Sequence, residues 1–199
     1  EEGICWGVGT YSATSSIAVR VFDSPSTTID VDWFVRRIEE ARDRRLALGI
    51  GKGSTTGYRV VFGEADGIPG FVLDCYADVC VYQLSTAGLE QLREMIIKAI
   101  DRVFSPRSVV ERSDVGVRKH EGLSQMPVGL LWGKPITHEI EILENGVKIL
   151  VNILLMGISI SAINIVPLIG PIFAFFVMIP ISTVYFFKLY RKIKLQSVS

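Results

Sequence analysis

Apolar and polar residues alternate in several short stretches of the chain, and this period of two predicts strands with one buried face. Ile17, Val19 and Val21 form the first such stretch, after a turn that contains Gly7 and Gly9. One strand cannot bury a core, so residues 1–24 are interpreted as the end of a small β-domain. The later strands are predicted at residues 58–62, 71–73, 79–83, 108–111, 129–132, 139–143 and 147–151.

Two other segments carry apolar residues at helical spacing. The first follows Asp30 or Asp32, and either carboxylate can cap a helix by accepting from free backbone N–H groups. Its apolar positions are Phe34, Ile38, Ala41 and Leu48. The second is predicted as one helix over residues 87–104 that ends before Pro106. Its apolar stripe consists of Leu89, Leu92, Ile96, Ile100 and Val103.

The remaining faces of the first helix carry arginines, and two interpretations of them stay open. These residues are Arg36, Arg37, Arg42, Arg44 and Arg45. A charged face is commonly just solvated, which would make residues 25–57 a linker helix with a flexible connector at 49–57. Alternatively, guanidinium groups on successive turns can straddle a phosphate backbone. The connector contains Gly-Lys-Gly-Ser but lacks the spacing of a phosphate-binding loop, so no nucleotide site is predicted there.

The strands and the second helix form one unit over residues 58–152. Residues 63–70 are a turn rich in glycine, in which Pro69 fixes φ, and residues 144–146 are a hairpin turn. The predicted fold class is α+β. It combines the remnant of a β-domain, a small mixed α/β central domain and a hydrophobic helical hairpin at the C-terminus.

The hydrophobic hairpin is predicted because no residue from Ile149 to Phe187 is charged. A helix spans a bilayer with about 20 apolar residues, and Pro167 and Pro171 divide this stretch into two arms. A single span over 171–190, preceded by an interfacial segment, is the alternative. The basic flank consists of Lys188, Arg191, Lys192 and Lys194. With a hairpin, this flank keeps residues 1–148 cytoplasmic and places residues 149–190 in the membrane. A third interpretation is that residues 153–199 come from a frameshift or a fusion.

Charge and cysteine content narrow the function further. The chain has 21 Lys and Arg against 21 Asp and Glu, but its tail is purely basic, so residues 1–148 are acidic overall. Binding of RNA therefore has to rest on local patches. Cys5, Cys75 and Cys80 form no C-x-x-C pair, and no signal peptide is visible, which favours the reducing cytosol. No metal site is predicted. A chain that starts at Glu1 without an initiator Met is expected to be a fragment.

A series of short motifs resembles a known family. In order they are Gly9-x-Tyr11-x-x-x-Ser15-x-Ile17-x-Val19-Arg20, Gly63-Glu64-Ala65-Asp66-Gly67-Ile68-Pro69-Gly70, Asp74-x-Tyr76-x-Asp78, Glu111-Arg112-Ser113-Asp114 with Arg118, Glu121-Gly122-Leu123 and Glu144-Asn145-Gly146. Together they resemble the class I S-adenosylmethionine-dependent methyltransferases that modify carbon five of a cytosine in large-subunit ribosomal RNA. The resemblance covers about residues 3–152.

The resemblance implies three parts: an RNA-binding PUA domain that ends in residues 1–24, the central domain at 58–152, and a Rossmann-like domain. The last part holds S-adenosylmethionine and a cysteine that attacks the pyrimidine ring. This chain departs from the family where that domain would begin, because Ile153-Leu154-Leu155-Met156-Gly157 stands where a glycine-rich cofactor segment is expected. Cys75 and Cys80 lie in the central domain, where burial in the core is the expected role. No catalytic or cofactor-binding residue is therefore predicted, and the chain itself is expected to bind no cofactor.

The residues expected to meet ribosomal RNA are Arg36, Arg37, Arg112, Ser113, Asp114, Arg118 and Lys119. Arg112 and Arg118 can each hold a phosphate with two hydrogen bonds, and Asp114 can orient one of them. The alternative is a salt-bridged turn that fixes the central domain against its neighbour. The predicted function is thus the RNA-positioning part of a cytoplasmic rRNA methyltransferase, inactive by itself. An integral membrane protein with a cytoplasmic RNA-binding-like domain is the second hypothesis, and the oligomeric state is not predicted.

Overall fold

The computed structural model describes residues 5–127, 129–136 and 139–152. The predicted membrane segment covers residues 149–190, and its part from residue 153 on, like the junction that departs from the family, lies outside these ranges. Its first residues, Ile149–Val151, belong to a β-strand and not to a helical arm. In the described part, no helix is both long and apolar enough to cross a bilayer. The chain begins with an antiparallel hairpin of β1 (Val8–Tyr11) and β2 (Val19–Asp23). The strand predicted at residues 17–21 therefore starts later than expected and has a partner that the sequence pattern did not indicate.

The centre of the fold is a five-stranded sheet in the order β3-β4-β5-β6-β7. Its strands are β3 (Gly57–Phe62), β4 (Phe71–Tyr76), β5 (Val79–Leu84), β6 (Ser108–Glu111) and β7 (Gly129–Gly133). All neighbours are antiparallel except β5 and β6, which are parallel and need a crossover connection. Helices supply that connection, so the mixed α/β character predicted for residues 58–152 is confirmed.

The crossover contains two helices where the apolar stripe predicted one. They are α2 (Ala87–Gln91) and α3 (Arg93–Phe104), and the predicted single helix over 87–104 is wrong at Leu92. Leu92 has φ −99° and ψ 6°, and its N–H bonds to Leu89 O, which ends the first helical ladder. Periodicity misses this break because Leu89, Ile96 and Ile100 all reach the same core from the two helices.

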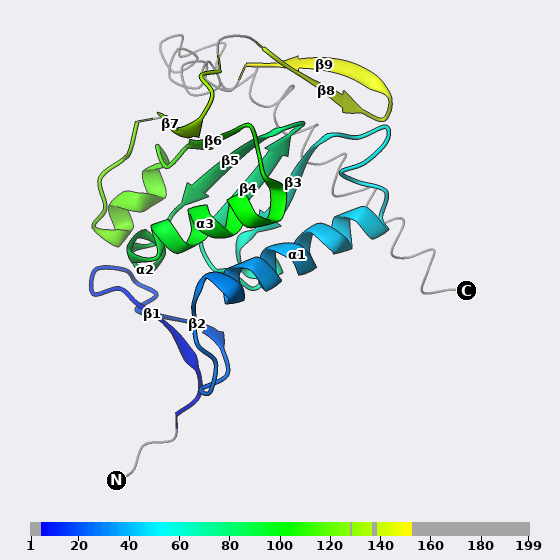
Figure 1. The fold of residues 1–199 in the computed structure, drawn as a ribbon. Helices are drawn as coiled ribbons and strands as arrows, with labels where there is room; N and C mark the ends of the chain where they lie inside the picture. Colours follow the sequence, from blue (N-terminus) through cyan, green and yellow to red (C-terminus); the bar gives the residue numbers. More distant parts are fainter. Residues whose placement is uncertain (1–4, 128, 137–138, 153–199) are drawn as a thin grey trace, which may run out of the picture. The chain divides into compact units, whose positions relative to one another are not determined.

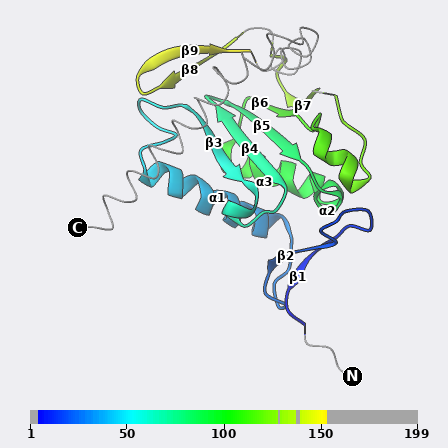
Figure 2. The ribbon, with the colours of Figure 1, turned by 180° about the vertical axis from the view of Figure 1, so that it is seen from behind.

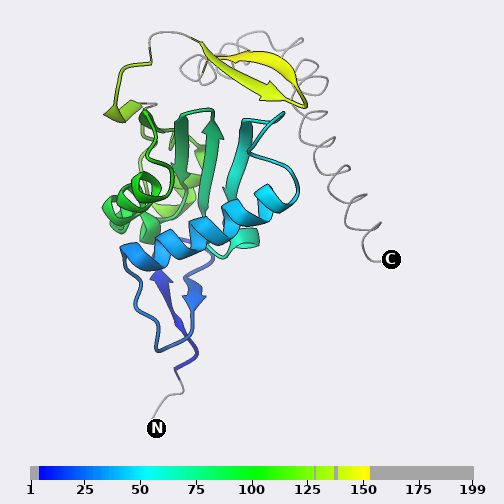
Figure 3. The same cartoon turned by 45° about the vertical axis from the view of Figure 1, so that its right-hand side comes forward.

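Helices α1 (Val31–Ala47) and α3 cover one face of the sheet, in front of it in Figure 1 and behind it in Figure 2. Figure 3 shows α1 lying across the strands. Of the two predicted caps Asp30 is the one that forms, by accepting a hydrogen bond of 2.8 Å from Trp33 N–H, whereas Asp32 lies in the first turn of α1. Trp33, Phe34, Ile38 and Ala41 are buried together with residues of the sheet such as Phe71. The apolar side of the predicted linker helix is therefore part of the central core.

A second hairpin packs on residues of the opposite face. It consists of β8 (Ile140–Glu144) and β9 (Val147–Val151), joined at Asn145 and Gly146, which both have positive φ. Ile140 and Ile142 pack with Val79, Val81 and Val110 in a second, smaller core. Alternation along β5 explains the two cores, because its odd-numbered valines face this hairpin while Cys80 and Tyr82 face the helices.

Asp23 at the end of β2 ties the first hairpin to α1, and its pKa offers a test of that contact. Its carboxylate accepts hydrogen bonds of 2.8 Å from Trp33 Nε1 and from Arg37. The bond from Trp33, then one from Ser24 N–H and a smaller contribution from Arg37, lower the Asp23 pKa from 3.8 to about 2. Because the pKa is depressed in the folded state, the contacts of the ionised carboxylate stabilise the fold at pH values above the ordinary pKa. This contribution is lost as the pH falls through about 2. We expect NMR titration of the carboxyl carbon to give this value, and Trp33→Phe to move it back toward 3.8. A wild-type midpoint near 3.8 would show that the contact does not form in solution.

Candidate functional site

The polar segment predicted to meet RNA starts at the end of β6 and includes η2 (Gly116–Glu121), a 3-10 helix. Its first residues are bound to the end of β5. Arg112 N–H donates to Tyr82 O at 2.8 Å, and Ser113 Oγ accepts from Leu84 N–H at 3.1 Å. Ser113 is fully buried, so its hydroxyl extends the hydrogen bonding of the sheet beyond β6.

Arg118 is the largest charged side chain inside the domain. It is only 1% exposed. Its guanidinium donates to Leu84 O at 2.7 Å, to Ser124 O at 2.8 Å and to Glu90 at 2.9 Å. All of these acceptors belong to the protein itself. This arrangement matches the alternative interpretation of the segment as a salt-bridged turn. Arg118 holds the segment against β5 and α2 and does not offer its guanidinium to a ligand.

The charged residues next to Arg118 pair with one another inside the protein. Arg93 pairs with both Glu90 and Glu111, and Tyr82 Oη donates to Glu111 at 3.2 Å. Burial opposes ionisation of Glu90, but the hydrogen bonds from Arg93 and Arg118 outweigh it and lower its pKa. Burial raises the pKa of Tyr82. Arginines thus hold Glu90 ionised and burial holds the Tyr82 phenol neutral, so neither of these two groups is poised for proton transfer near neutral pH.

Glu121, at the end of η2, connects this segment to the first hairpin. Its side chain is 3% exposed. It accepts a hydrogen bond of 2.8 Å from Arg20 of β2 and one of 3.1 Å from Ala87 N–H of α2. A cavity of about 250 Å³ lies beside this contact and is lined by Phe62, Thr86 and Val117 among others. Sequence analysis did not single out Glu121 as a site residue, because its partners lie far away along the chain.

Among the predicted RNA contacts, two are exposed and Arg112 is partly exposed. Lys119 and Arg36 are exposed, on η2 and α1. The Arg112 side chain is 21% exposed and lies 3.6 Å from Asp114. Arg112 Nε and Asp114 Oδ1 have no hydrogen-bond partner among the described residues, although both atoms are shielded from solvent. Unpaired polar atoms of this kind are costly unless a ligand or water completes them.

The other arginines of α1 are engaged within the protein. Arg37 pairs with Asp23 and Glu40 and stacks over the Trp33 ring. Arg44 and Arg45 bind Asp66, and Arg42 pairs with Asp43. The phosphate-contacting patch of five arginines is therefore reduced to Arg36 at most. No group of three or more His, Cys, Asp or Glu residues in the described ranges could hold a metal ion.

The chain is similar to known rRNA methyltransferases. No family model matches it. It is 44% identical over 147 residues to Ribosomal RNA large subunit methyltransferase I of Aeromonas salmonicida, a match that covers 73% of this chain and 36% of that protein. The corresponding protein of Vibrio cholerae is 41% identical over 152 residues, covering 76% of this chain and 38% of the relative. The chain thus spans well under half the length of these relatives.

Solved structures share the fold at lower identity. A crystal structure of a putative methyltransferase complexed with SAH superimposes with a TM-score of 0.59 at 19% identity, covering 79% of this chain and 42% of that chain. A putative SAM-dependent methyltransferase from Streptococcus mutans gives 0.58 at 19% identity, with the same coverage. The fold described above therefore occurs as part of longer chains described as methyltransferases.

Proposed function

We propose that this chain is the RNA-positioning part of a ribosomal RNA large subunit methyltransferase and does not transfer the methyl group by itself. The observation that carries the proposal is the 44% identity over 147 residues to a methyltransferase of which the chain spans 36%. Within this proposal, β1 and β2 are the end of a PUA domain and residues 58–152 are the central domain. S-adenosylmethionine belongs to the complete enzyme, ribosomal RNA is the partner, and the cytoplasm is the location.

The described residues support a binding role better than a chemical one. The buried charges around Arg118 are paired and fix the fold, as shown by the bonds from Arg118 to Leu84 O and Glu90. In the same segment Lys119 is exposed and the Arg112 side chain is 21% exposed, and both can donate to phosphate oxygens. Contacts of this kind position RNA without reading its sequence. Arg36 on α1 supplies a further exposed cation.

Binding to large-subunit rRNA should be salt-dependent, and single substitutions should identify the contacts. We expect Arg112→Ala and Lys119→Ala each to lower the slope of log affinity against log salt by about one, because each removes one phosphate contact. Arg102→Ala is the control, since Arg102 is an arginine whose side chain is 54% exposed, but it lies on α3 and pairs with Asp32. The measurement is filter binding over a range of salt concentrations. An equal loss in the Arg102 variant, or a wild-type affinity that is independent of salt, would refute the assignment of these contacts.

A further inference from the structure

Two thiols face each other across the β4–β5 hairpin. Cys75 and Cys80 are direct cross-strand partners, one pair away from the Ala77-Asp78 turn. Their Sγ atoms are 3.3 Å apart, and both side chains are buried on the face of the sheet that the helices cover. Direct cross-strand partners have Cβ atoms about 4.5–5.5 Å apart, and the lower end of this range meets the upper end of the range found in disulfides, about 3.5–4.5 Å. Rotation of both side chains together with a slight approach of the two strands would bring the two sulfur atoms within bonding distance.

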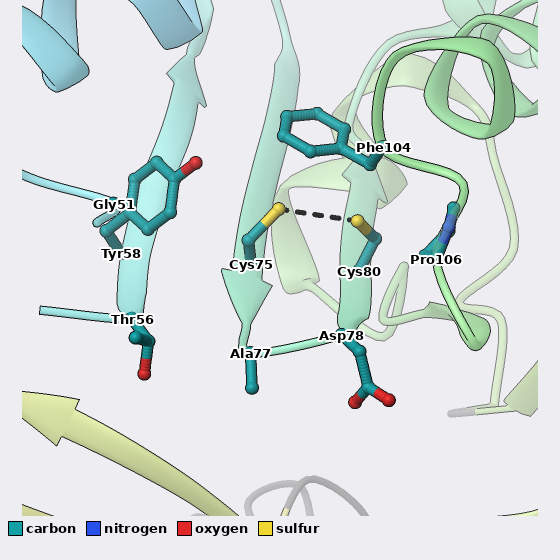
Figure 4. A pocket seen from close by; sticks show the side chains of 9 residues that line it. All are labelled: Gly51, Thr56, Tyr58, Cys75, Ala77, Asp78, Cys80, Phe104 and Pro106. Atoms are coloured by element: carbon teal, nitrogen blue, oxygen red, sulfur yellow. Dashed lines mark hydrogen bonds between the residues drawn. The ribbon is translucent and has the colours of Figure 1, made fainter. Parts of the chain in front are cut away.

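A cavity opens onto this pair. It has a volume of about 370 Å³ and is lined by both cysteines. Tyr58 and Phe104 flank the two sulfur atoms, and Gly51 and Thr56 belong to the loop before β3 (Figure 4). A side chain at position 51 would fill part of this space, because a Cβ there would lie 2.6 Å from the Tyr58 ring. Residue 51 is glycine, so a small molecule can approach thiols that are themselves almost inaccessible to solvent.

We propose that Cys75 and Cys80 form a modification site at which hydrogen peroxide converts two thiols into an intramolecular disulfide. One sulfur attacks a peroxide oxygen, which breaks the O–O bond and yields a sulfenic acid and one water molecule. The second sulfur then attacks the sulfenic sulfur, forms the S–S bond and releases the oxygen as a second water molecule. The two cysteines lose two electrons and two protons in total, and the peroxide takes up both.

The surroundings determine which oxidants can act and how fast. The hydrogen bond with Cys80, together with burial, raises the pKa of the Cys75 thiol well above its ordinary value. Only a small fraction of Cys75 is thus a thiolate at neutral pH, and its reaction is slower than that of an exposed, activated cysteine. Proximity favours the second step, because the resolving thiol is already in contact when the sulfenic acid forms. The site is independent of the proposed RNA contacts at Arg112 and Lys119.

The test uses the full chain with Cys5→Ser, which removes the exposed third thiol. The folded protein is treated with hydrogen peroxide, quenched, denatured and alkylated. We expect about ten-fold less alkylation of the pair than in untreated protein, with no added oxygen, and full recovery after dithiothreitol. A protease that cuts before aspartate cleaves at Asp78, between the two cysteines. Its two fragments should stay linked until they are reduced.

Two variants keep the result falsifiable. In Cys5→Ser with Cys80→Ser, Cys75 should stop at a sulfenic acid that dimedone traps, and no linked fragments should form. In Cys5→Ser with Cys75→Ser, Cys80 should likewise stop at a sulfenic acid, and no linked fragments should form. Full alkylation of both thiols after peroxide, or added oxygen without linked fragments in the Cys5→Ser chain, would overturn the proposal even if a double variant fails to fold.

Discussion

Replacing Arg118 with alanine should lower the free energy of unfolding by about 3–5 kcal/mol, the range typical of breaking a buried ion pair. The side chain is 1% exposed, so its removal leaves Leu84 O, Ser124 O and one oxygen of Glu90 without their donor. Water cannot readily replace a guanidinium at that depth. Urea denaturation followed by circular dichroism measures the change.

The neighbouring position provides the control for Arg118. Lys119 carries the same charge one residue away but is exposed, so Lys119→Ala should change the free energy of unfolding by no more than about 0.5 kcal/mol. The opposite ranking is expected for RNA affinity, where Lys119 contributes and Arg118 acts only through the fold. A loss below about 1 kcal/mol for Arg118→Ala would mean that its guanidinium is not buried in solution.

Asp66→Asn should cost about 2–3 kcal/mol, because it removes the charge of a carboxylate that holds α1 against the turn after β3. The Asp66 side chain is 2% exposed and accepts from Arg45 at 2.5 and 2.6 Å, from Arg44 at 2.8 Å and from Phe62 N–H at 2.7 Å. An asparagine side chain has nearly the same volume as aspartate, but its single oxygen can accept from only some of these donors. The expected cost is reduced because Arg44 is 51% exposed and partly screened by solvent.

The pH dependence of stability distinguishes this charge effect from packing. Burial opposes ionisation of Asp66, but hydrogen bonds from Arg45 and Arg44 and from Phe62 N–H outweigh it and hold the pKa below 3.8. The contribution of the Asp66 charge to stability is therefore present at pH values above the unfolded pKa. It is lost as the pH falls through the lower pKa of the folded state. Wild type and Asp66→Asn should differ most near neutral pH and converge in acid. A difference that does not change with pH would contradict the charge-based account.

Local sequence patterns predicted the elements whose cause is local. Alternation predicts the strands of the central sheet. A carboxylate just before residues of helical spacing predicts a cap at Asp30 or Asp32, and the cap is Asp30. The hairpin at Asn145 and Gly146 followed from residues that tolerate positive φ. Burial of Cys75 and Cys80 was also predicted and is confirmed.

Contacts between distant residues were beyond these patterns. Arg118 binds Glu90 and Leu84 across 28 and 34 positions of the chain, and a charged residue in a loop is ordinarily exposed, so burial of Arg118 could not be predicted. The break at Leu92 left no trace in the apolar stripe because both helices contribute to it. The seven predicted RNA contacts consequently separate into buried, paired and exposed residues, a division that only the three-dimensional arrangement makes visible.

The most direct test of the proposed function is transfer of a labelled methyl group. The chain is incubated with large-subunit rRNA and methyl-labelled S-adenosylmethionine, next to the full-length relative from Aeromonas salmonicida as the positive control. We expect the relative to label the RNA and this chain to incorporate no label above the reaction without protein, under salt conditions in which it binds the same RNA. Incorporation by this chain that disappears when Cys5, Cys75 or Cys80 is replaced by serine would contradict the account.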